Sequence, residues 1–245
     1  MTNSDILFTQ KLELAAALRW SDRLALSEGI CNHYSVVHPS DPSLFLLNPQ
    51  GIHWSEIRVS DIITVDVDGN VVDGKHAIEP SAFYIHSRIH SNNSKAKCVM
   101  HTHMPHATAL CCIEDGQLQW CSQNSLRYFN DVAYDREFNG VANAKDEGDR
   151  LATALGNKRI LFLEHHGVIV AGSCIAHAFD DLYYLERTCE LQLVAMSSGK
   201  PLKLIADDMA FETCKEIEAV CREQSNSHME AIKRILLAED PSLAE

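Results

Sequence analysis

The chain has 245 residues, of which 46% are hydrophobic, and its formal net charge at pH 7 is −13. This length and composition are typical of one globular domain with a substantial core, so we expect a single domain over residues 1–245. The negative charge argues against nucleic acids and anionic membranes as partners, because both bind basic surfaces, and no apolar run approaches the ~18 residues of a membrane span.

The cysteines and the first residues predict where the protein works. There are nine cysteines, an odd number, and no C-x-x-C pair. We expect free thiols in a reducing compartment, with a cysteine-ligated zinc as the alternative. Residues 1–5 lack the basic and apolar regions of a secretion signal. We therefore expect a cytoplasmic protein.

The first third of the chain predicts a helix followed by two hairpins. Leucines recur at helical spacing in residues 6–27, which predicts a helix there. Short apolar runs separated by Pro-rich and Asp-Gly turns predict strands. We place these strands at residues 31–38, 44–47, 62–67 and 71–72. We expect the first hairpin, residues 34–47, to lie at the edge of the sheet.

The rest of the chain alternates irregularly between helices and strands. Helices are predicted at residues 81–90, 106–113, 145–155, 174–197 and over the last ~35 residues, and strands at 98–103 and 160–170. Residues 117–136 read as irregular. We find no phosphate-binding P-loop and no G-x-G-x-x-G. The pattern predicts an α/β fold with a mixed, mostly antiparallel sheet covered by helices.

Histidines at two predicted strands are the main candidate for chemistry. His101 and His103 are two residues apart, so a strand would place both imidazoles on one face. His165 and His166 lie in the second strand, before Gly167, where a glycine permits close approach. Two histidines from one strand and one from the other would leave a metal with an open position, as catalysis requires. The alternative is structural histidines at strand ends.

A second histidine pair lies on a predicted helix. His86 and His90 are four residues apart and would share one face of that helix. They could be a metal-binding pair, or simply buried or surface groups.

Together these motifs resemble the class II aldolase/adducin family, of the fuculose phosphate aldolase type, over about residues 8–205. The resemblance implies a three-layer α/β/α sandwich and a homotetramer with active sites between subunits. It also implies one divalent ion held by His101, His103 and His166, because the family ligand directly precedes the glycine. Zinc is the first expectation, with manganese, iron, cobalt or nickel as alternatives. Glu164 and His165 would then support the ligands or pack in the core.

Two segments depart from the family pattern. Residues 48–51, Asn-Pro-Gln-Gly, replace the hydroxyl-bearing phosphate loop, and residues 79–82, Glu-Pro-Ser-Ala, replace Pro-Ser-Ser-Glu. The usual glutamate position is therefore Ala82. The resemblance thus implies a substrate without a phosphate group.

We therefore expect a metal-dependent carbon–carbon lyase that acts by aldol cleavage or decarboxylation. The substrate would be a non-phosphorylated carbonyl or carboxylate compound, cleaved through a metal-stabilised enolate. A non-haem iron oxygenase on the same scaffold and a non-catalytic adducin-like binding domain are the alternatives.

Six further residues are candidates for the site. Three of them could transfer protons: His106, which lies three residues after His103, Tyr128 and Glu79. An amide, a guanidinium and a hydroxyl could bind the small-molecule substrate: Asn32, Arg127 and Ser81.

Overall fold

A single eight-stranded sheet forms the centre of the molecule. The computed structural model describes residues 2–140 and 145–245. The strand order is β4-β3-β2-β1-β5-β8-β7-β6, and every neighbouring pair is antiparallel except β6 and β7. The strands are β1 (His33–Val37), β2 (Leu44–Leu47), β3 (Ile63–Asp66), β4 (Val71–Asp73), β5 (Cys98–Thr102), β6 (Val132–Asp135), β7 (Ile160–Leu163) and β8 (Gly167–Gly172).

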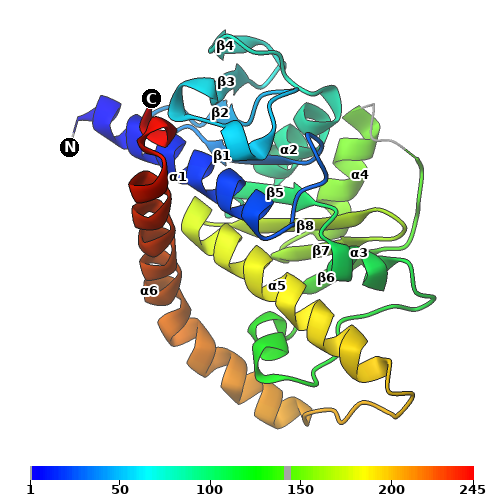
Figure 1. Cartoon of the computed structure of the whole chain (residues 1–245). Coiled ribbons are helices and arrows are strands. Elements are labelled where there is room, and N and C mark those ends of the chain that lie inside the picture. The colour runs from blue at the N-terminus through cyan, green and yellow to red at the C-terminus, as the bar shows by residue number, and fades with distance from the viewer. Residues whose placement is uncertain (1, 141–144) are drawn as a thin grey trace.

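Helices cover both faces of the sheet and make three layers (Figure 1). Four helices lie on one face: α1 (Asn3–Arg23), α3 (Pro105–Cys111), α5 (Ile175–Met196) and α6 (Asp207–Glu239). Two lie on the other: α2 (Pro80–Asn92) and α4 (Lys145–Leu155). Apolar side chains fill both spaces between the layers, which confirms the predicted α/β/α sandwich. The assignment of residues 1–245 to one domain stays a prediction.

The central strand β5, which contains the predicted metal ligand His101, is held rigidly within the fold. All five of its residues, Cys98–Thr102, are buried, because helices pack on both faces of the sheet and β1 and β8 flank the strand. Helix α2 begins at Pro80, whose fixed φ suits the first helical turn, and the Glu79 carboxylate accepts a hydrogen bond from the Ala82 amide. The site is thus built on rigid elements.

Three predictions about strands were wrong. The hairpin over residues 34–47 does not lie at the sheet edge, because β3 pairs with β2 and β5 pairs with β1. Residues 132–135, predicted to be irregular, form β6 at one edge. Residues 160–170 are two strands joined by a tight turn at Glu164–His166. The order of strands depends on contacts between distant parts of the sequence, so the local pattern does not predict it. The turn at residues 164–166 contains no glycine, so the local sequence did not mark it as a turn.

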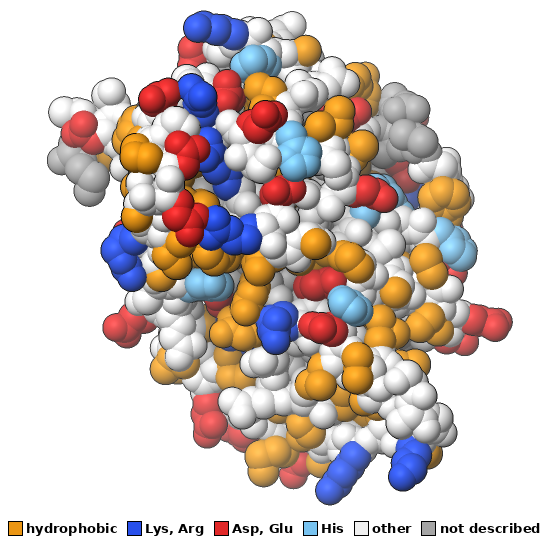
Figure 2. Space-filling model, in the orientation of Figure 1, with side chains coloured by type: hydrophobic (Ala, Val, Ile, Leu, Met, Phe, Trp, Pro, Cys, Tyr) orange, Lys and Arg blue, Asp and Glu red, His pale blue; other side chains and the backbone are white. Residues whose placement is uncertain are grey.

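The cysteines form no disulfides, and exposed hydrophobic side chains gather in one region of the surface. All nine cysteines are free, as expected. Within residues 2–140 and 145–245, we find no helix whose length and hydropathy would let it cross a membrane. Hydrophobic side chains, orange in Figure 2, gather over the end of α5 and the start of α6. Among the exposed ones are Leu191, Val194, Met209 and Phe211.

Candidate metal centre

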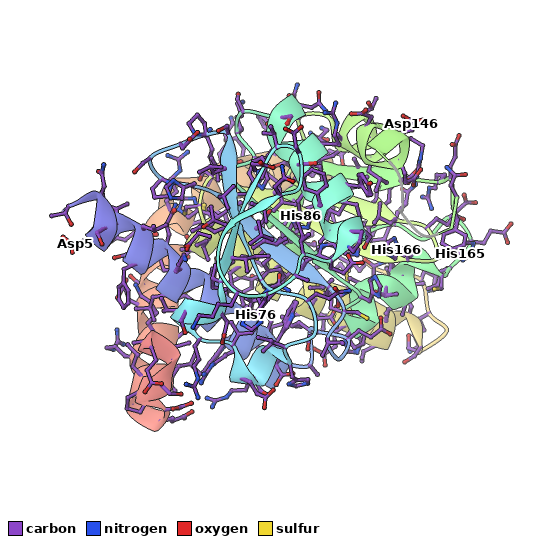
Figure 3. The ribbon with its side chains drawn as sticks, turned by 90° about the horizontal axis from the view of Figure 1, so that it is seen from above. Asp5, His76, His86, Asp146, His165 and His166 are labelled. Atoms are coloured by element: carbon purple, nitrogen blue, oxygen red, sulfur yellow. The ribbon has the colours of Figure 1, made fainter. Side chains whose placement is uncertain are left out.

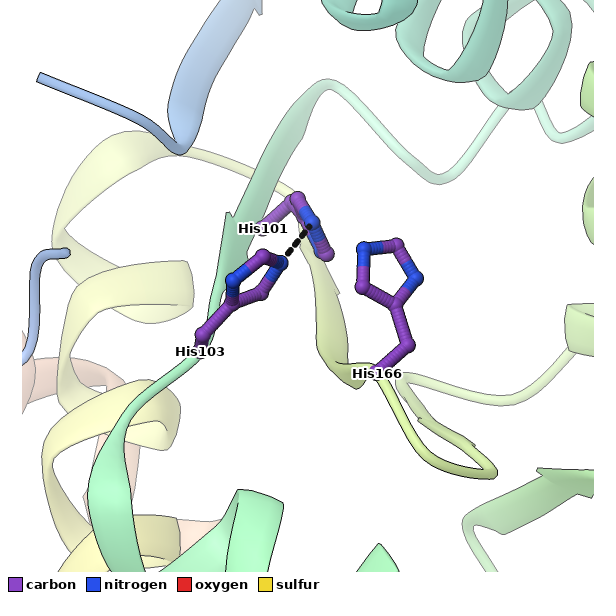
Figure 4. Close-up of side chains that lie close together, drawn as sticks. All are labelled: His101, His103 and His166. Atoms are coloured by element: carbon purple, nitrogen blue, oxygen red, sulfur yellow. Dashed lines mark hydrogen bonds between the residues drawn. The ribbon is translucent and has the colours of Figure 1, made fainter. Parts of the chain in front are cut away.

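Three histidines from two neighbouring parts of the sheet converge on one point. His101 lies in β5, His103 follows that strand directly, and His166 lies in the turn between β7 and β8 (Figure 3). One ring nitrogen from each lies within 4.8 Å of the others, and Figure 4 shows the three rings facing a common space. Among the described residues this is the group of ligating side chains that could hold a metal ion.

Hydrogen bonds fix which nitrogen each β5 histidine offers. His101 Nδ1 donates to the Val168 carbonyl at 3.0 Å, and His103 Nδ1 donates to the Glu28 carboxylate at 2.5 Å. In the neutral rings both Nε2 atoms are therefore unprotonated, yet they lie only 3.2 Å apart. Two facing lone pairs repel unless a cation lies between them. Zn–N bonds of ~2.0–2.1 Å place two tetrahedral ligand nitrogens ~3.3–3.4 Å apart, so this donor set fits a metal ion.

Burial keeps the ligands in the form that binds a metal. Burial lowers the pKa of His166 to about 4, and the nearby His103 also lowers it, although carboxylates around the ring oppose this. Burial also holds the pKa of His101 well below its usual range. Both imidazoles are therefore neutral near pH 7, and a neutral imidazole has the free lone pair that metal binding requires.

The turn after β7 explains why His166, and not His165, faces the other two. His165 has a φ of 59°, its side chain is exposed, and its Nε2 lies 3.9 Å from Glu164 (Figure 3). A Cβ on Gly167 would lie 2.5 Å from the Thr102 carbonyl oxygen, so only glycine lets the turn approach β5 this closely. This close approach brings His166 beside His101 and His103.

Three of the predicted substrate and proton-transfer residues lie beside His103 or beside His33, a histidine on β1. The Asn32 side-chain oxygen accepts hydrogen bonds from the amides of Glu28 and His103. The Glu79 carboxylate accepts from Ser81 Oγ at 2.5 Å and lies 4.0 Å from His33 Nε2. Asn32 Nδ2 is buried and has no hydrogen-bond partner within residues 2–140 and 145–245.

The other three predicted residues are engaged elsewhere. His106 Nδ1 donates to Glu186 on α5 at 2.8 Å. The Tyr128 hydroxyl is buried and donates to a backbone carbonyl of α5. Arg127 pairs with Asp180 at 2.5 Å and lines a cavity of about 1000 Å³ whose described lining contains none of the three converging histidines. The structure does not bring Tyr128 and Arg127 together with those histidines.

The sequence reasoning missed two residues that contact the candidate ligands. His33 pairs with His101 across the β1–β5 ladder, with ring centroids 5.0 Å apart. Glu28 lies in a loop 75 residues before His103, which its carboxylate contacts. The strand register and the loop position that create these contacts are set by tertiary structure. The sequence provided only a weak indication for His33: it would share one face of the predicted strand at residues 31–38 with Ser35, so that face carries two polar side chains.

Comparisons with known proteins find sequence relatives over most of the chain. Residues 12–193 match the model of the class II aldolase and adducin N-terminal domain. A putative aldolase class 2 protein from Caulobacter vibrioides is 32% identical over 87% of this chain and 82% of its own length. Decarboxylase NovR from Streptomyces niveus is 28% identical over 96% of this chain and 86% of its own length.

A solved structure supports the same assignment. L-fuculose 1-phosphate aldolase from Glaciozyma antarctica PI12 superposes with a TM-score of 0.87 and 25% identity, over 96% of this chain and 93% of its own. The fold and the matched sequence therefore agree over most of the chain. The chain belongs to the class II aldolase and adducin family.

Proposed function

We propose that this protein is a divalent-metal-dependent carbon–carbon lyase acting by aldol cleavage or decarboxylation on a non-phosphorylated carbonyl or carboxylate compound. The observation that carries the proposal is the convergence of the nitrogens of His101, His103 and His166, with two of the rings held by Val168 and Glu28. A purely binding domain has no need of such a donor set. Relatives named as an aldolase and a decarboxylase support the lyase class.

The metal would supply charge stabilisation, and the chain would supply orientation. A divalent ion held by His101, His103 and His166 would supply Lewis-acid stabilisation of the negative charge that develops on a substrate oxygen as a carbon–carbon bond breaks. The unpartnered Asn32 Nδ2 is suited to donate to a substrate oxygen, because a buried donor without a partner is costly unless function uses it. The Glu79 carboxylate lies half-buried beside His33, and its pKa is below its usual range, so it is ionised near pH 7 and would accept a proton or a hydrogen bond from the substrate.

The N-terminus of α2 supports a substrate without phosphate. Phosphate groups commonly bind at helix N-termini, where backbone amides are free. Here the Glu79 carboxylate accepts from the Ala82 amide and from Ser81 Oγ, so these donors are already used. Burial raises the pKa of Glu79, but the hydrogen bonds from Ser81 and Ala82 together with the nearby His33 hold the pKa below its usual range. The resulting negative charge would repel a phosphate.

We also propose a homotetramer with the metal centres near subunit boundaries. The Glu28 side chain is exposed and His103 is partly exposed, so the centre opens to the surface. A neighbouring subunit would close such a site and exclude water, which strengthens electrostatic effects within it.

The test of the lyase assignment is metal-dependent turnover. Protein stripped with a chelator and reloaded with zinc or manganese would be incubated with hydroxy-keto acids and aromatic carboxylic acids, with release of aldehyde, pyruvate or carbon dioxide followed. We expect turnover only in the reloaded protein and none in the His166→Ala variant. Turnover that survives metal removal, or that consumes one oxygen molecule per product, would contradict the proposal.

A further inference from the structure

A continuous chain of buried hydrogen bonds runs from a backbone carbonyl to the edge of the metal centre. His90 Nδ1 contacts the Ala96 carbonyl oxygen at 2.6 Å, and His90 Nε2 contacts Ser35 Oγ at 2.7 Å. Ser35 Oγ contacts His86 Nδ1 at 2.5 Å, and His86 Nε2 contacts His33 Nδ1 at 2.7 Å. All four side chains are buried, and Figure 3 labels His86 near the centre of the view.

The backbone carbonyl fixes the direction of every bond in this chain. A carbonyl oxygen only accepts, so His90 must carry its proton on Nδ1, and its neutral ring accepts at Nε2. The Ser35 hydroxyl must then donate to His90 and accept from His86 Nδ1. It follows that His86 Nε2 accepts from His33 Nδ1. The opposite direction would leave Ser35 Oγ and His90 Nε2 as two facing acceptors.

The surroundings favour neutral rings along the whole chain. His33 Nε2 lies 4.0 Å from the Glu79 carboxylate, beyond hydrogen-bond distance, as expected when that nitrogen carries no proton. Burial lowers the pKa of His90 to about 4. It also holds the pKa of His86 well below its usual range. His86 and His90 are therefore neutral near pH 7, as the hydrogen-bond directions require.

The chain ends in an acceptor that faces the site. With its proton on Nδ1, neutral His33 has a free lone pair on Nε2, which lies 4.0 Å from the Glu79 carboxylate. Glu79 is also an acceptor. The His33 ring lies 5.0 Å from the ring of His101, between centroids. Two acceptors that face each other beside a metal ligand are complementary to a group that donates a hydrogen bond.

We propose that His90, Ser35 and His86 are positioning residues that lock His33 as a hydrogen-bond acceptor, and that His33 with Glu79 selects ligands bearing a hydroxyl beside their metal-binding oxygen. The second half of this proposal rests on the proposed metal function. The first half concerns the protein alone and stands independently of it.

The first experiment measures the position of the protons in metal-free protein. Nitrogen-15 NMR of labelled histidine distinguishes the two neutral tautomers and the imidazolium, with signals assigned through single His→Gln variants. We expect His33, His86 and His90 to carry their protons on Nδ1 at pH 7. An Nε2–H tautomer of His33, or an imidazolium paired with Glu79, would overturn the proposal.

A matched pair of variants isolates the hydroxyl of Ser35. Ser35→Thr keeps the hydroxyl and Ser35→Val replaces it with a methyl group, so any effect of added volume in this buried strand position is shared. We expect His33 to keep its Nδ1–H tautomer in Ser35→Thr. In Ser35→Val the Ala96 carbonyl no longer sets the direction of the hydrogen bond between His86 and His33. Glu79 should then draw the His33 proton to Nε2. An unchanged His33 tautomer in Ser35→Val would contradict the relay.

The second experiment tests selection of the ligand. Zinc-loaded protein would be titrated calorimetrically with glycolate, which donates from its hydroxyl, and with methoxyacetate, whose ether oxygen can bind a metal but cannot donate. We expect glycolate to bind at least ~10-fold more tightly to the wild-type protein and to Ser35→Thr, a ratio equivalent to ~1.4 kcal/mol. This preference should disappear in Ser35→Val and His33→Phe.

The outcomes separate the two proposals. Equal affinity for both acids in zinc-loaded wild-type protein would refute ligand selection by His33. Failure to bind zinc at all would refute the metal function, while the NMR measurement on metal-free protein would still decide the relay.

Discussion

The Nδ1 atoms of His101 and His103 are held by acceptors of very different kinds. His101 is held by a backbone carbonyl, which substitution cannot remove, whereas His103 is held by the exposed carboxylate of Glu28. Groups that hold a metal-binding imidazole fix its orientation and increase its basicity. Of these two supports, only the Glu28 carboxylate can be removed by substitution, so its contribution to metal binding is the one that can be measured.

Glu28→Ala should weaken metal binding by ~10–100-fold without unfolding the protein, because it frees the His103 ring to rotate. Competition with a chromophoric chelator measures this affinity. Glu114→Ala is a suitable control, since Glu114 is also an exposed loop carboxylate and makes no hydrogen bond through its side chain within residues 2–140 and 145–245. Equal zinc affinity in the two variants would show that Glu28 does not support the site.

Asn32 combines an unusual backbone with side-chain hydrogen bonds. Its φ is 78°, and its side-chain oxygen holds the amides of Glu28 and His103. We expect Asn32→Ala to lower the free energy of unfolding by ~1–3 kcal/mol, through lost hydrogen bonds and backbone strain. Asn32→Asp keeps the acceptor and should cost less. Urea unfolding measures both variants, and the reverse order would contradict this role.

At the scale of elements, the N-terminus of α2 distinguishes this chain from a sugar-phosphate enzyme. We predict negligible cleavage of fuculose 1-phosphate and rhamnulose 1-phosphate, because Glu79 occupies the amide and hydroxyl donors and adds a negative charge. A coupled assay of aldehyde release on metal-loaded protein measures this. Turnover of either substrate at ~1 per second or faster, an ordinary enzymic rate, would overturn the substrate class.

The elements also show what local sequence can predict. Helices bounded by proline or glycine, such as α2 and α4, were located closely, because these residues restrict or free the backbone at particular positions. Strand β6 was missed because it is short, only partly buried and mixed in polarity. The His-x-His pair was visible through the period of a strand. The contacts of Glu28 and His33 were not, because they depend on which segments the fold brings together.

At the scale of the whole molecule, apolar surface remains beyond the three layers. Leu191 and Val194 on α5 are exposed, as are Met209 and Phe211 on α6. The hairpin of β1 and β2 lies inside the sheet, so it offers no open edge to a neighbouring subunit. The exposed apolar residues and the open metal centre are therefore the structural support for an oligomer.

We predict a homotetramer of about four times the 27.4 kDa chain mass. Multi-angle light scattering at micromolar concentration measures the mass directly. Replacing Val194 and Phe211 with charged residues should shift the mass towards smaller species if these helices form the contacts. A stable monomer with full activity would refute both the assembly and the closure of the site by a neighbouring subunit.

The metal content of purified variants tests the central claim most directly. Elemental analysis should find one divalent ion per chain in the wild-type protein and in His165→Ala, because His165 faces away from the other histidines. His166→Ala should lose tight binding, since its ring completes the group of three ligands. The two substitutions lie at adjacent positions in the same turn, so any general destabilisation of that turn should affect both variants. Full metal occupancy in His166→Ala would contradict the assigned centre.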